Sequence, residues 1–117
     1  MVYELDDESL PYTTIGTDQA QTMIASGSHV VDVRRPEEWH RGHIAEAELV
    51  TIDGIYTFGK GLQDLNLPQD EDVIFVCASG QRSAMASEIA ALVGFKRIYN
   101  LANGMNGWVG RGYPIER

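Results

Sequence analysis

The single cysteine of this chain, Cys77, lies where an apolar run ends and a loop of small residues begins, in the stretch VIFVCASGQRSA at residues 73 to 84. Within the run it would be a small core residue; at the exit it can act as a nucleophile. Successive backbone N–H groups of a loop containing Gly80 can turn inward around one point. A helix that opens at or beside Ser83 adds free N–H groups and the positive end of its dipole. The pattern predicts a reactive sulfur in an anion-binding nest.

The size of the electrostatic effect indicates what such a nest is for. A nest that lowers a thiol pKa by about two units raises the thiolate fraction at pH 7 about 25-fold. Intrinsic nucleophilicity falls roughly six- to tenfold at the same time, because the Brønsted slope is ~0.4 to 0.5. Ionisation alone therefore gains only about threefold. We expect the nest to hold a negatively charged donor or a charged sulfur intermediate.

Apolar segments along the chain alternate between strand-like and helix-like patterns. Runs rich in β-forming residues predict strands at 12–16, 29–33, 48–51, 73–77 and 97–101. Strands separated by helices indicate an α/β fold, with a parallel sheet covered by helices on both faces. Ligands of open parallel sheets bind outside the carboxyl ends of the strands, which is where Cys77 lies.

Helix signals separate these strands. Thr17 is a candidate N-cap for a helix that Gly27 ends, and Pro36 fixes the start of a short helical turn over RPEEWHRG. The Gly-rich segment 103–115 predicts a final turn or short helix.

Two further segments are predicted to be helical. Residues 52–66 predict one or two short helices, broken at Gly54, Gly59 and Gly61. The segment 83–94 closes with a glycine and places four apolar residues at helical spacing: Met85, Ile89, Leu92 and Val93.

Composition and charge limit the function classes. A chain of 117 residues with 44% apolar and 22% charged residues is expected to form one globular domain. Its net charge of −8 should repel nucleic acid and anionic membrane surfaces. No apolar stretch approaches the ~18 residues of a membrane span, and the start MVYELDDESL is acidic where a secretory signal is basic. One cysteine forms no intrachain disulfide, so we expect a cytoplasmic protein.

Three segments resemble the motifs of a known family. VVDVRRPEEWHRGHI resembles the D-V-R-x-P-x-E-[WF]-x-x-G-H-I signature of rhodanese-like domains. CASGQRS resembles their C-x-x-G-x-R-S active-site loop, and NLANGMNGWVGRGYPI is similar to their closing L-x-G-G-x-x-x-W-x-x-x-G-x-P segment. The motifs follow the family's order over residues ~12 to 115.

The resemblance implies a rhodanese-like α/β fold, with a five-stranded parallel sheet flanked by helices on both faces, in a single domain of residues 1–117. It implies that Cys77 takes a sulfane sulfur from thiosulfate or a persulfide, carries it as Cys–S–SH, and gives it to a nucleophilic acceptor. The carrier would be cradled by the loop amides, which are those of Ala78, Ser79, Gly80, Gln81, Arg82 and Ser83.

Two positions depart from the family's pattern. Ala45 and Glu46 replace the usual Pro-Gly after G-H-I, so that a loop can run differently. Asn103 replaces the first glycine of the Gly-Gly pair, and we expect it to tolerate left-handed backbone there.

Several polar and aromatic residues have a structural interpretation beside a functional one. Arg82 either attracts the donor or braces the loop. Asp32 and Arg34 are expected to brace neighbouring strand ends, and Arg34 could pair with Glu38 across one helical turn. Trp39 and Trp108 are expected to be packing anchors. The histidines lack ligand-like spacing, so we expect no metal site, and we expect no cofactor: His29, His40 and His43.

Three functions fit the loop. The first is sulfur transfer from a small-molecule donor, thiosulfate or a persulfide, to a cyanide, thiol or protein acceptor. The second is a cysteine phosphatase; that class has five residues between its cysteine and arginine and commonly a histidine before the cysteine, whereas four separate Cys77 from Arg82 and Val76 precedes. The third is a binding or sulfur-relay module whose thiol meets only a protein partner. Neither pathway nor oligomeric state follows from the sequence.

Overall fold

The sheet of the computed structural model, which describes residues 9–117, has five parallel strands in the order β1-β5-β4-β2-β3. The strands are β1 Thr13–Ile15, β2 His29–Asp32, β3 Ala47–Leu49, β4 Val73–Val76 and β5 Ile98–Leu101. The acidic residues at the start of the chain, from which we expect no secretory signal, lie within residues 1–8, outside the described residues. The predicted five-stranded α/β architecture is confirmed.

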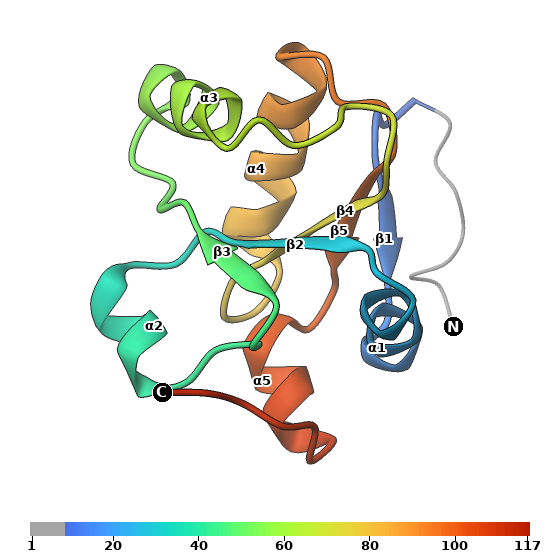
Figure 1. Cartoon of the computed structure of the whole chain (residues 1–117), viewed down its shortest axis with the longest axis vertical. Helices are drawn as coiled ribbons and strands as arrows, with labels where there is room; N and C mark the ends of the chain where they lie inside the picture. The colour runs from blue at the N-terminus through green and yellow to red at the C-terminus, as the bar shows by residue number, and fades with distance from the viewer. Residues whose placement is uncertain (1–8) are drawn as a thin grey trace.

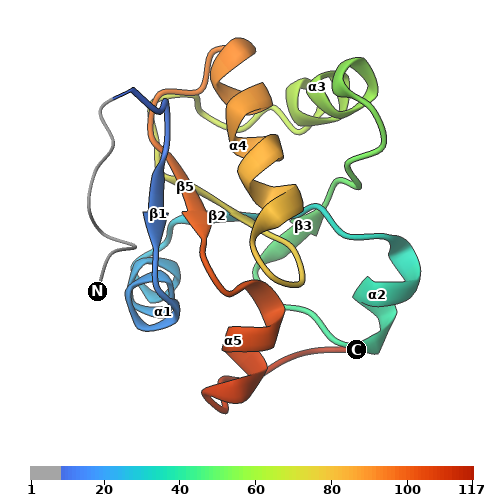
Figure 2. The same cartoon turned by 180° about the vertical axis from the view of Figure 1, so that it is seen from behind.

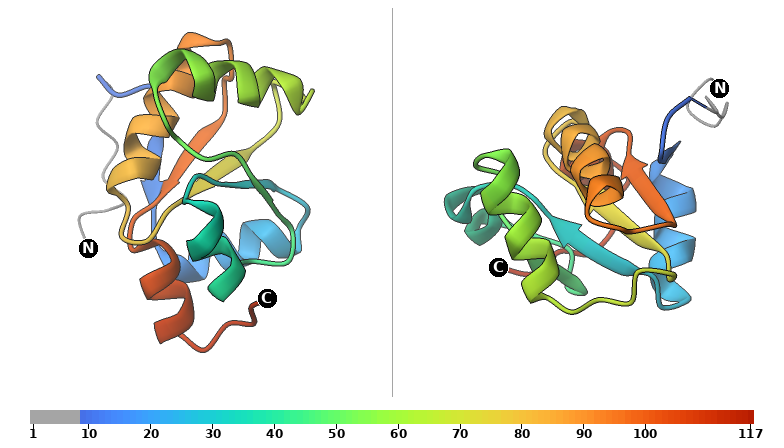
Figure 3. Two further views of the ribbon diagram at one scale, coloured as in Figure 1. Left: turned by 90° about the vertical axis from the view of Figure 1, so that its left-hand side faces the viewer. Right: turned by 90° about the horizontal axis from the view of Figure 1, so that it is seen from above.

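Helices cover both faces of the sheet (Figures 1 and 2). α1 Thr17–Ala25 and α5 Gly104–Gly110 pack on one face, and α3 Ile55–Asp64 and α4 Gln81–Leu92 pack on the other. The side views show the twisted sheet between the two pairs (Figure 3). The short helix α2 Pro36–Arg41 lies between β2 and β3 in sequence, close to the C-terminus (Figure 1), where Glu116 forms an isolated antiparallel bridge with His43.

Strand β4 is apolar throughout because it lies at the centre of the sheet. Val73 and Phe75 pack in the core beneath α3 and α4, while Ile74 and Val76 pack in the core beneath α1 and α5. All four side chains are at most 1% exposed. A strand covered on both faces needs no polar alternation, so the sequence runs apolar until the sheet ends at Cys77.

Helix α3 runs unbroken through Gly59 and Gly61, so the prediction of short, broken helices was wrong. Both glycines instead allow close packing. A Cβ at Gly59 would lie 3.3 Å from Cγ1 of Val93, and one at Gly61 would lie 2.8 Å from Cγ1 of Val50. The cost of glycine in a helix is offset here by the approach of neighbouring elements.

The buried face of α4 also differs from the predicted one. Met85 and Leu92 are 56% and 80% exposed, although Ile89 is buried as expected. The other buried residues of α4 are small, and a smooth face lets the helix lie close to the sheet: Ser83, Ala86, Ser87 and Ala90.

Two predicted boundaries shift slightly. Thr17 is the first residue of α1 and not its N-cap, which is Gly16 in extended conformation without a side-chain cap. Strand β3 covers Ala47–Leu49, so it begins one residue earlier and ends two residues earlier than the predicted segment 48–51. The bounds of β3 are set by its hydrogen bonds to β2, which is its neighbour at this edge of the sheet.

A buried ion pair braces the end of β2. Arg34 Nη2 donates to Asp32 Oδ2 at 2.7 Å and to the carbonyl oxygen of Gly42 at 2.8 Å, and Arg34 Nε also donates to Asp32. Both side chains are almost fully buried. The two side chains brace the end of β2 and the loop at Gly42, not a neighbouring strand end as predicted. The predicted pair of Arg34 with Glu38 is wrong, because Arg34 points back to Asp32.

We predict that Asp32→Ala lowers the free energy of unfolding by ~3 kcal/mol, because it leaves the buried Arg34 charge without its carboxylate. Urea unfolding measures this loss. Asp53→Ala removes an exposed carboxylate as the control and should change stability by less than ~0.5 kcal/mol. A loss below ~1 kcal/mol for Asp32→Ala would show that the pair contributes little.

Candidate functional site

The Cys77 sulfur lies at the carboxyl end of β4, under the loop that leads into α4. The backbone N–H of Gly80 donates to Sγ at 3.0 Å, and the Ser83 hydroxyl oxygen lies 3.4 Å from it. The residue is only 1% exposed. The loop therefore turns its backbone toward the sulfur, as the sequence pattern predicted.

The surroundings hold the pKa of the Cys77 thiol below its usual value. Burial raises this pKa, but that effect is outweighed by the hydrogen-bonding contact with the Ser83 hydroxyl and by the backbone N–H groups of Ser83, Ser79 and Gly80. Three of the six amides assigned to the cradle thus interact with the sulfur. Of the other three residues, Ala78 follows the cysteine directly, and Gln81 and Arg82 form the first turn of α4.

Gly80 has a left-handed backbone, with φ of 99°, directly before α4. A Cβ at this position would collide with the carbonyl oxygen of Ala102, in the turn between β5 and α5. Any side chain would push the loop off this turn and move the Gly80 N–H away from the sulfur. Glycine is required here for both reasons, conformation and space.

Helix α5 fastens the other side of the loop. The N–H groups of Met105 and Asn106 donate to the carbonyl oxygens of Cys77 and Ala78 at 2.8 and 3.0 Å. Gly104 makes this approach through positive φ, whereas Asn103 has φ of −104°. The expectation of left-handed backbone at Asn103 was therefore wrong.

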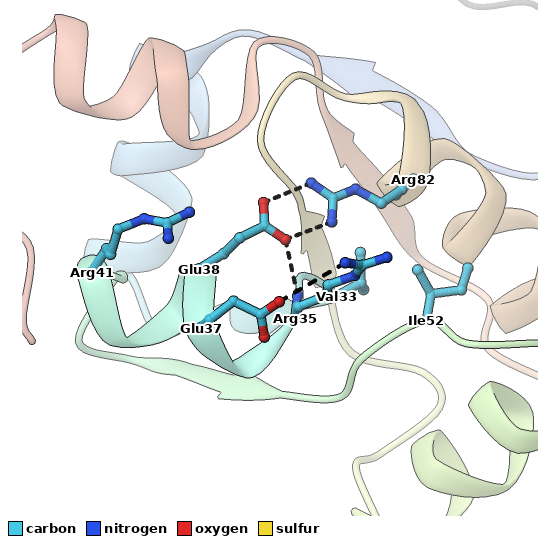
Figure 4. A pocket seen from close by; sticks show the side chains of 7 residues that line it. All are labelled: Val33, Arg35, Glu37, Glu38, Arg41, Ile52 and Arg82. Carbon is cyan, nitrogen blue, oxygen red and sulfur yellow. Dashed lines mark hydrogen bonds and ion pairs between the residues drawn. The ribbon is translucent and has the colours of Figure 1, made fainter.

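Arg82 forms a two-fold hydrogen-bonded pair with Glu38 of α2. Its Nη1 and Nη2 donate to the two carboxylate oxygens at 2.8 and 2.9 Å, as Figure 4 shows. The hydrogen bonds from Arg82 hold the pKa of Glu38 at about 2, and Glu38 in turn raises the pKa of Arg82. Of the two interpretations of Arg82, the geometry favours bracing, because the pair ties the start of α4 to α2.

Two hollows flank this pair, and both are lined by Glu38 and Arg41. One, of about 630 Å³, also includes Arg35 and Arg82 (Figure 4). The other, of about 480 Å³, extends to Ala78 of the loop and to Met105 and other residues of α5. The second hollow therefore reaches the loop that follows Cys77, whereas the first reaches Arg82 in the first turn of α4.

Sequence reasoning missed two residues of this region. Arg41 lies on the rim of both hollows, and its guanidinium forms no hydrogen bond or ion pair with the residues that the structure describes. Asn100, on β5, lies within hydrogen-bond distance of Ser83. No sequence motif marks Arg41. Asn100 could have been found from the sequence, because a polar residue inside an apolar strand needs a buried hydrogen-bond partner.

Residues 9–117 contain neither a cluster of metal ligands nor a membrane-spanning helix. No group of three or more histidine, cysteine, aspartate and glutamate side chains in that part of the chain is placed to hold a metal ion. None of its helices combines the length and apolarity needed to cross a membrane.

Residues 16–111 match the model of the rhodanese-like domain family. The chain belongs to the rhodanese-like family. Thiosulfate sulfurtransferase 18 of Arabidopsis thaliana is 30% identical over 113 residues, which cover 88% of this chain and 82% of the relative. A sulfurtransferase of Allochromatium vinosum is 31% identical over 115 residues, covering 98% and 95% of the two chains.

A solved structure shows the same fold. The rhodanese-related protein of Thermoplasma volcanium superposes with a TM-score of 0.76 at 28% identity, covering 90% of this chain and 98% of that one. Together with the sulfurtransferases at about 30% identity, the rhodanese-like match supports sulfur transfer in general as the activity of this chain.

We predict a pH-dependent loss of stability in Glu38→Gln. The pKa of Glu38 is lowered on folding, so the stability contributed by its pair with Arg82 is complete above pH ~4.5 and is lost as the pH falls toward 2. Because the pair is partly exposed, we expect the variant to be less stable by about 1 kcal/mol at pH 7 and the difference to shrink at pH 3.

Unfolding by urea at both pH values measures this difference. Glu88→Gln, which alters an exposed carboxylate of α4, is the control and should stay within ~0.5 kcal/mol of the unmodified protein at both pH values. A Glu38→Gln difference that is the same at pH 3 and pH 7 would contradict the role assigned to the pair.

Proposed function

We propose that residues 1–117 form one sulfurtransferase domain, which moves a sulfane sulfur from thiosulfate or a persulfide to a thiol or cyanide acceptor through a persulfide on Cys77. The observation that supports this most directly is the buried Cys77 sulfur at the end of β4, which accepts a hydrogen bond from the Gly80 N–H. A thiolate in this position is stabilised by a backbone N–H group whose position is fixed by the loop.

The proposed reaction has two displacement steps. In the first, the Cys77 thiolate attacks the outer sulfur of thiosulfate; the sulfur–sulfur bond of the donor breaks, and sulfite leaves with its electron pair. In the second, the acceptor attacks the outer sulfur of the persulfide, and the Cys77 thiolate leaves. With cyanide the product is thiocyanate. No net oxidant or reductant is needed.

The loop would cradle the charge that this reaction moves. After the first step the negative charge lies on the outer sulfur, one bond farther from the protein core than the thiolate charge was. Backbone N–H groups around the sulfur can hold an anion there without a side-chain base. We assign this role to the amides of Ala78, Ser79, Gly80, Gln81, Arg82 and Ser83.

The chain offers no internal way to remove the carried sulfur. Cys77 is its only cysteine, so no second thiol can attack the persulfide and close an intrachain disulfide. Turnover therefore requires an external nucleophile, either a small molecule or the thiol of a partner protein. A sulfur-relay module would use the same persulfide, with a protein as its acceptor.

The structure gives a phosphatase little support. Such an enzyme needs a free arginine to hold the phosphoryl oxygens in a nest. Here both terminal nitrogens of Arg82 are engaged by Glu38, and four residues, not five, separate Arg82 from Cys77. The sulfur transfer proposed here needs no free arginine inside the nest.

We propose that Arg41 attracts the anionic sulfur donor toward the loop. The protein carries a net charge of −8, which disfavours anions in general. Arg35 and Arg82, which share a hollow with Arg41, are paired with Glu37 and Glu38. In Figure 4 the Arg41 side chain extends toward the Glu38 side of the hollow without joining an ion pair.

We predict that thiosulfate adds one sulfur, about 32 Da, to the protein, and that added cyanide removes it. Intact-mass spectrometry measures both changes. Cys77→Ser is the control and should gain no mass. An aryl phosphate, incubated separately, should be neither hydrolysed nor attached as a phosphoryl group.

Mass gain in Cys77→Ser would contradict the assignment of Cys77 as carrier. A loaded protein that discharges to a protein thiol but not to cyanide or glutathione would identify a relay module. Phosphoryl transfer without sulfur loading would overturn the proposal in favour of a phosphatase.

We predict that Arg41→Ala raises the KM for thiosulfate about fivefold with little change in kcat, because one unpaired charge near an anion contributes about 1 kcal/mol. Steady-state thiocyanate formation measures both constants. Lys96→Ala is the matched control, since it removes one exposed positive charge next to β5 at the opposite ends of the strands. Equal effects of the two substitutions would show that only the net charge matters.

A further inference from the structure

The Ser83 hydroxyl lies between two buried groups that compete for its single hydrogen. Its oxygen is 2.5 Å from Oδ1 of Asn100 and 3.4 Å from Sγ of Cys77. Ser83, Asn100 and Cys77 are 0%, 5% and 1% exposed, so water does not substitute for a missing partner. Each hydrogen in this cluster must therefore be assigned to one acceptor.

A neighbouring carbonyl group decides how the Asn100 amide is turned. Asn100 Nδ2 donates to the carbonyl oxygen of Gly80 at 3.3 Å. That oxygen can only accept, so the amide nitrogen must face it and Oδ1 must face Ser83. Since Oδ1 also can only accept, the Ser83 hydroxyl donates its hydrogen to Asn100.

This assignment suits an uncharged sulfur. With its hydrogen on Asn100, Ser83 presents lone pairs to Cys77, and a neutral S–H can donate to them. A thiolate cannot, and it is stabilised by the Ser83 hydroxyl only if the hydrogen turns from Asn100 to the sulfur. Oδ1 of Asn100 then loses its donor inside the protein, which has a cost.

The other groups that face Cys77 are backbone donors of the loop and two ion pairs. The N–H groups of the loop donate to the sulfur from the backbone. The nearby charges are Arg82 of α4, paired with Glu38 of α2, and Arg34, paired with Asp32 at the end of β2. Substitution of Asn100, which lies on β5, removes its hydrogen bond to the Gly80 carbonyl oxygen, but that oxygen still accepts from the Ala84 N–H, and the two ion pairs contain no atom of Asn100.

We propose that Asn100 is a positioning residue, which competes with the Cys77 sulfur for the Ser83 hydrogen and thereby favours the states in which that sulfur is uncharged. With respect to turnover, the inference rests on the proposed function. In the persulfide the charge lies on the outer sulfur, so the inner sulfur is neutral and the Ser83 hydrogen returns to Asn100. Asn100 thus favours the loaded carrier over the free thiolate.

The first test measures the ionisation of Cys77 without any sulfur transfer. Because the chain has one thiol, the rate of alkylation by iodoacetamide as a function of pH reports Cys77 alone. Asn100→Leu, similar in size but without the acceptor, should move the midpoint to lower pH by about one unit, a tenfold change in the ionisation constant. Asn100→Ala should move it in the same direction if the leucine variant does not fold.

A double-mutant cycle separates this role from a general structural one. Ser83→Ala should raise the midpoint, because the hydroxyl donor is lost. In the Ser83→Ala protein, Asn100→Leu should then have no further effect. Ser87→Ala, which removes the next buried hydroxyl along α4, is the matched control and should leave the midpoint unchanged.

An Asn100→Leu midpoint that is unchanged or raised would overturn the inference, as would an equal shift with and without the Ser83 hydroxyl. The second test is discharge of the loaded protein to cyanide, followed by intact mass. Asn100→Leu should discharge about threefold faster, since a thiolate of lower pKa is the better leaving group. If no loaded form appears, the proposed function fails while the alkylation cycle still decides the role of Asn100.

Discussion

The carbonyl oxygen of Ala102 leaves room for backbone but not for a side chain at Gly80, and the site depends on that contact. Without a side chain, Gly80 adopts the left-handed conformation in which its N–H points at the Cys77 sulfur, and α4 begins at the next residue. On the other side, the first N–H groups of α5 bind the carbonyl oxygens of Cys77 and Ala78. The sulfur is thus enclosed by backbone, whose dipoles are positioned before any anion arrives.

Charged side chains serve mainly to hold this enclosure. Arg82 ties the start of α4 to Glu38 of α2, and Arg34 ties the end of β2 to the loop at Gly42. Each arginine makes at least two hydrogen bonds to the carboxylate of its partner. Arg41 lines both hollows beside this enclosure and adds a positive charge there in an otherwise acidic protein.

The hydrogen bonds around Cys77 divide into fixed and movable donors. Backbone N–H groups cannot turn away from the sulfur, and they favour an anion in every state. The Ser83 hydroxyl can turn, and Asn100 offers it an alternative acceptor. The proposed persulfide chemistry would use both properties, because the Cys77 sulfur would alternate between a charged and an uncharged form. A neutral competitor for one donor adjusts that balance without a second titratable group.

The sequence by itself determined the local features: alternating strands and helices, the uninterrupted apolar β4, Cys77 at its exit and the need for glycine at position 80. These follow from periodicity and backbone conformation, which neighbouring residues report directly. Only the tertiary structure decided the strand order, the continuity of α3 and the partners of Arg82 and Ser83, which are 44 and 17 residues distant. The physical reason is that contacts between elements depend on how the elements pack. Thus Gly59 and Gly61, which favour a break locally, are kept helical by what lies against them.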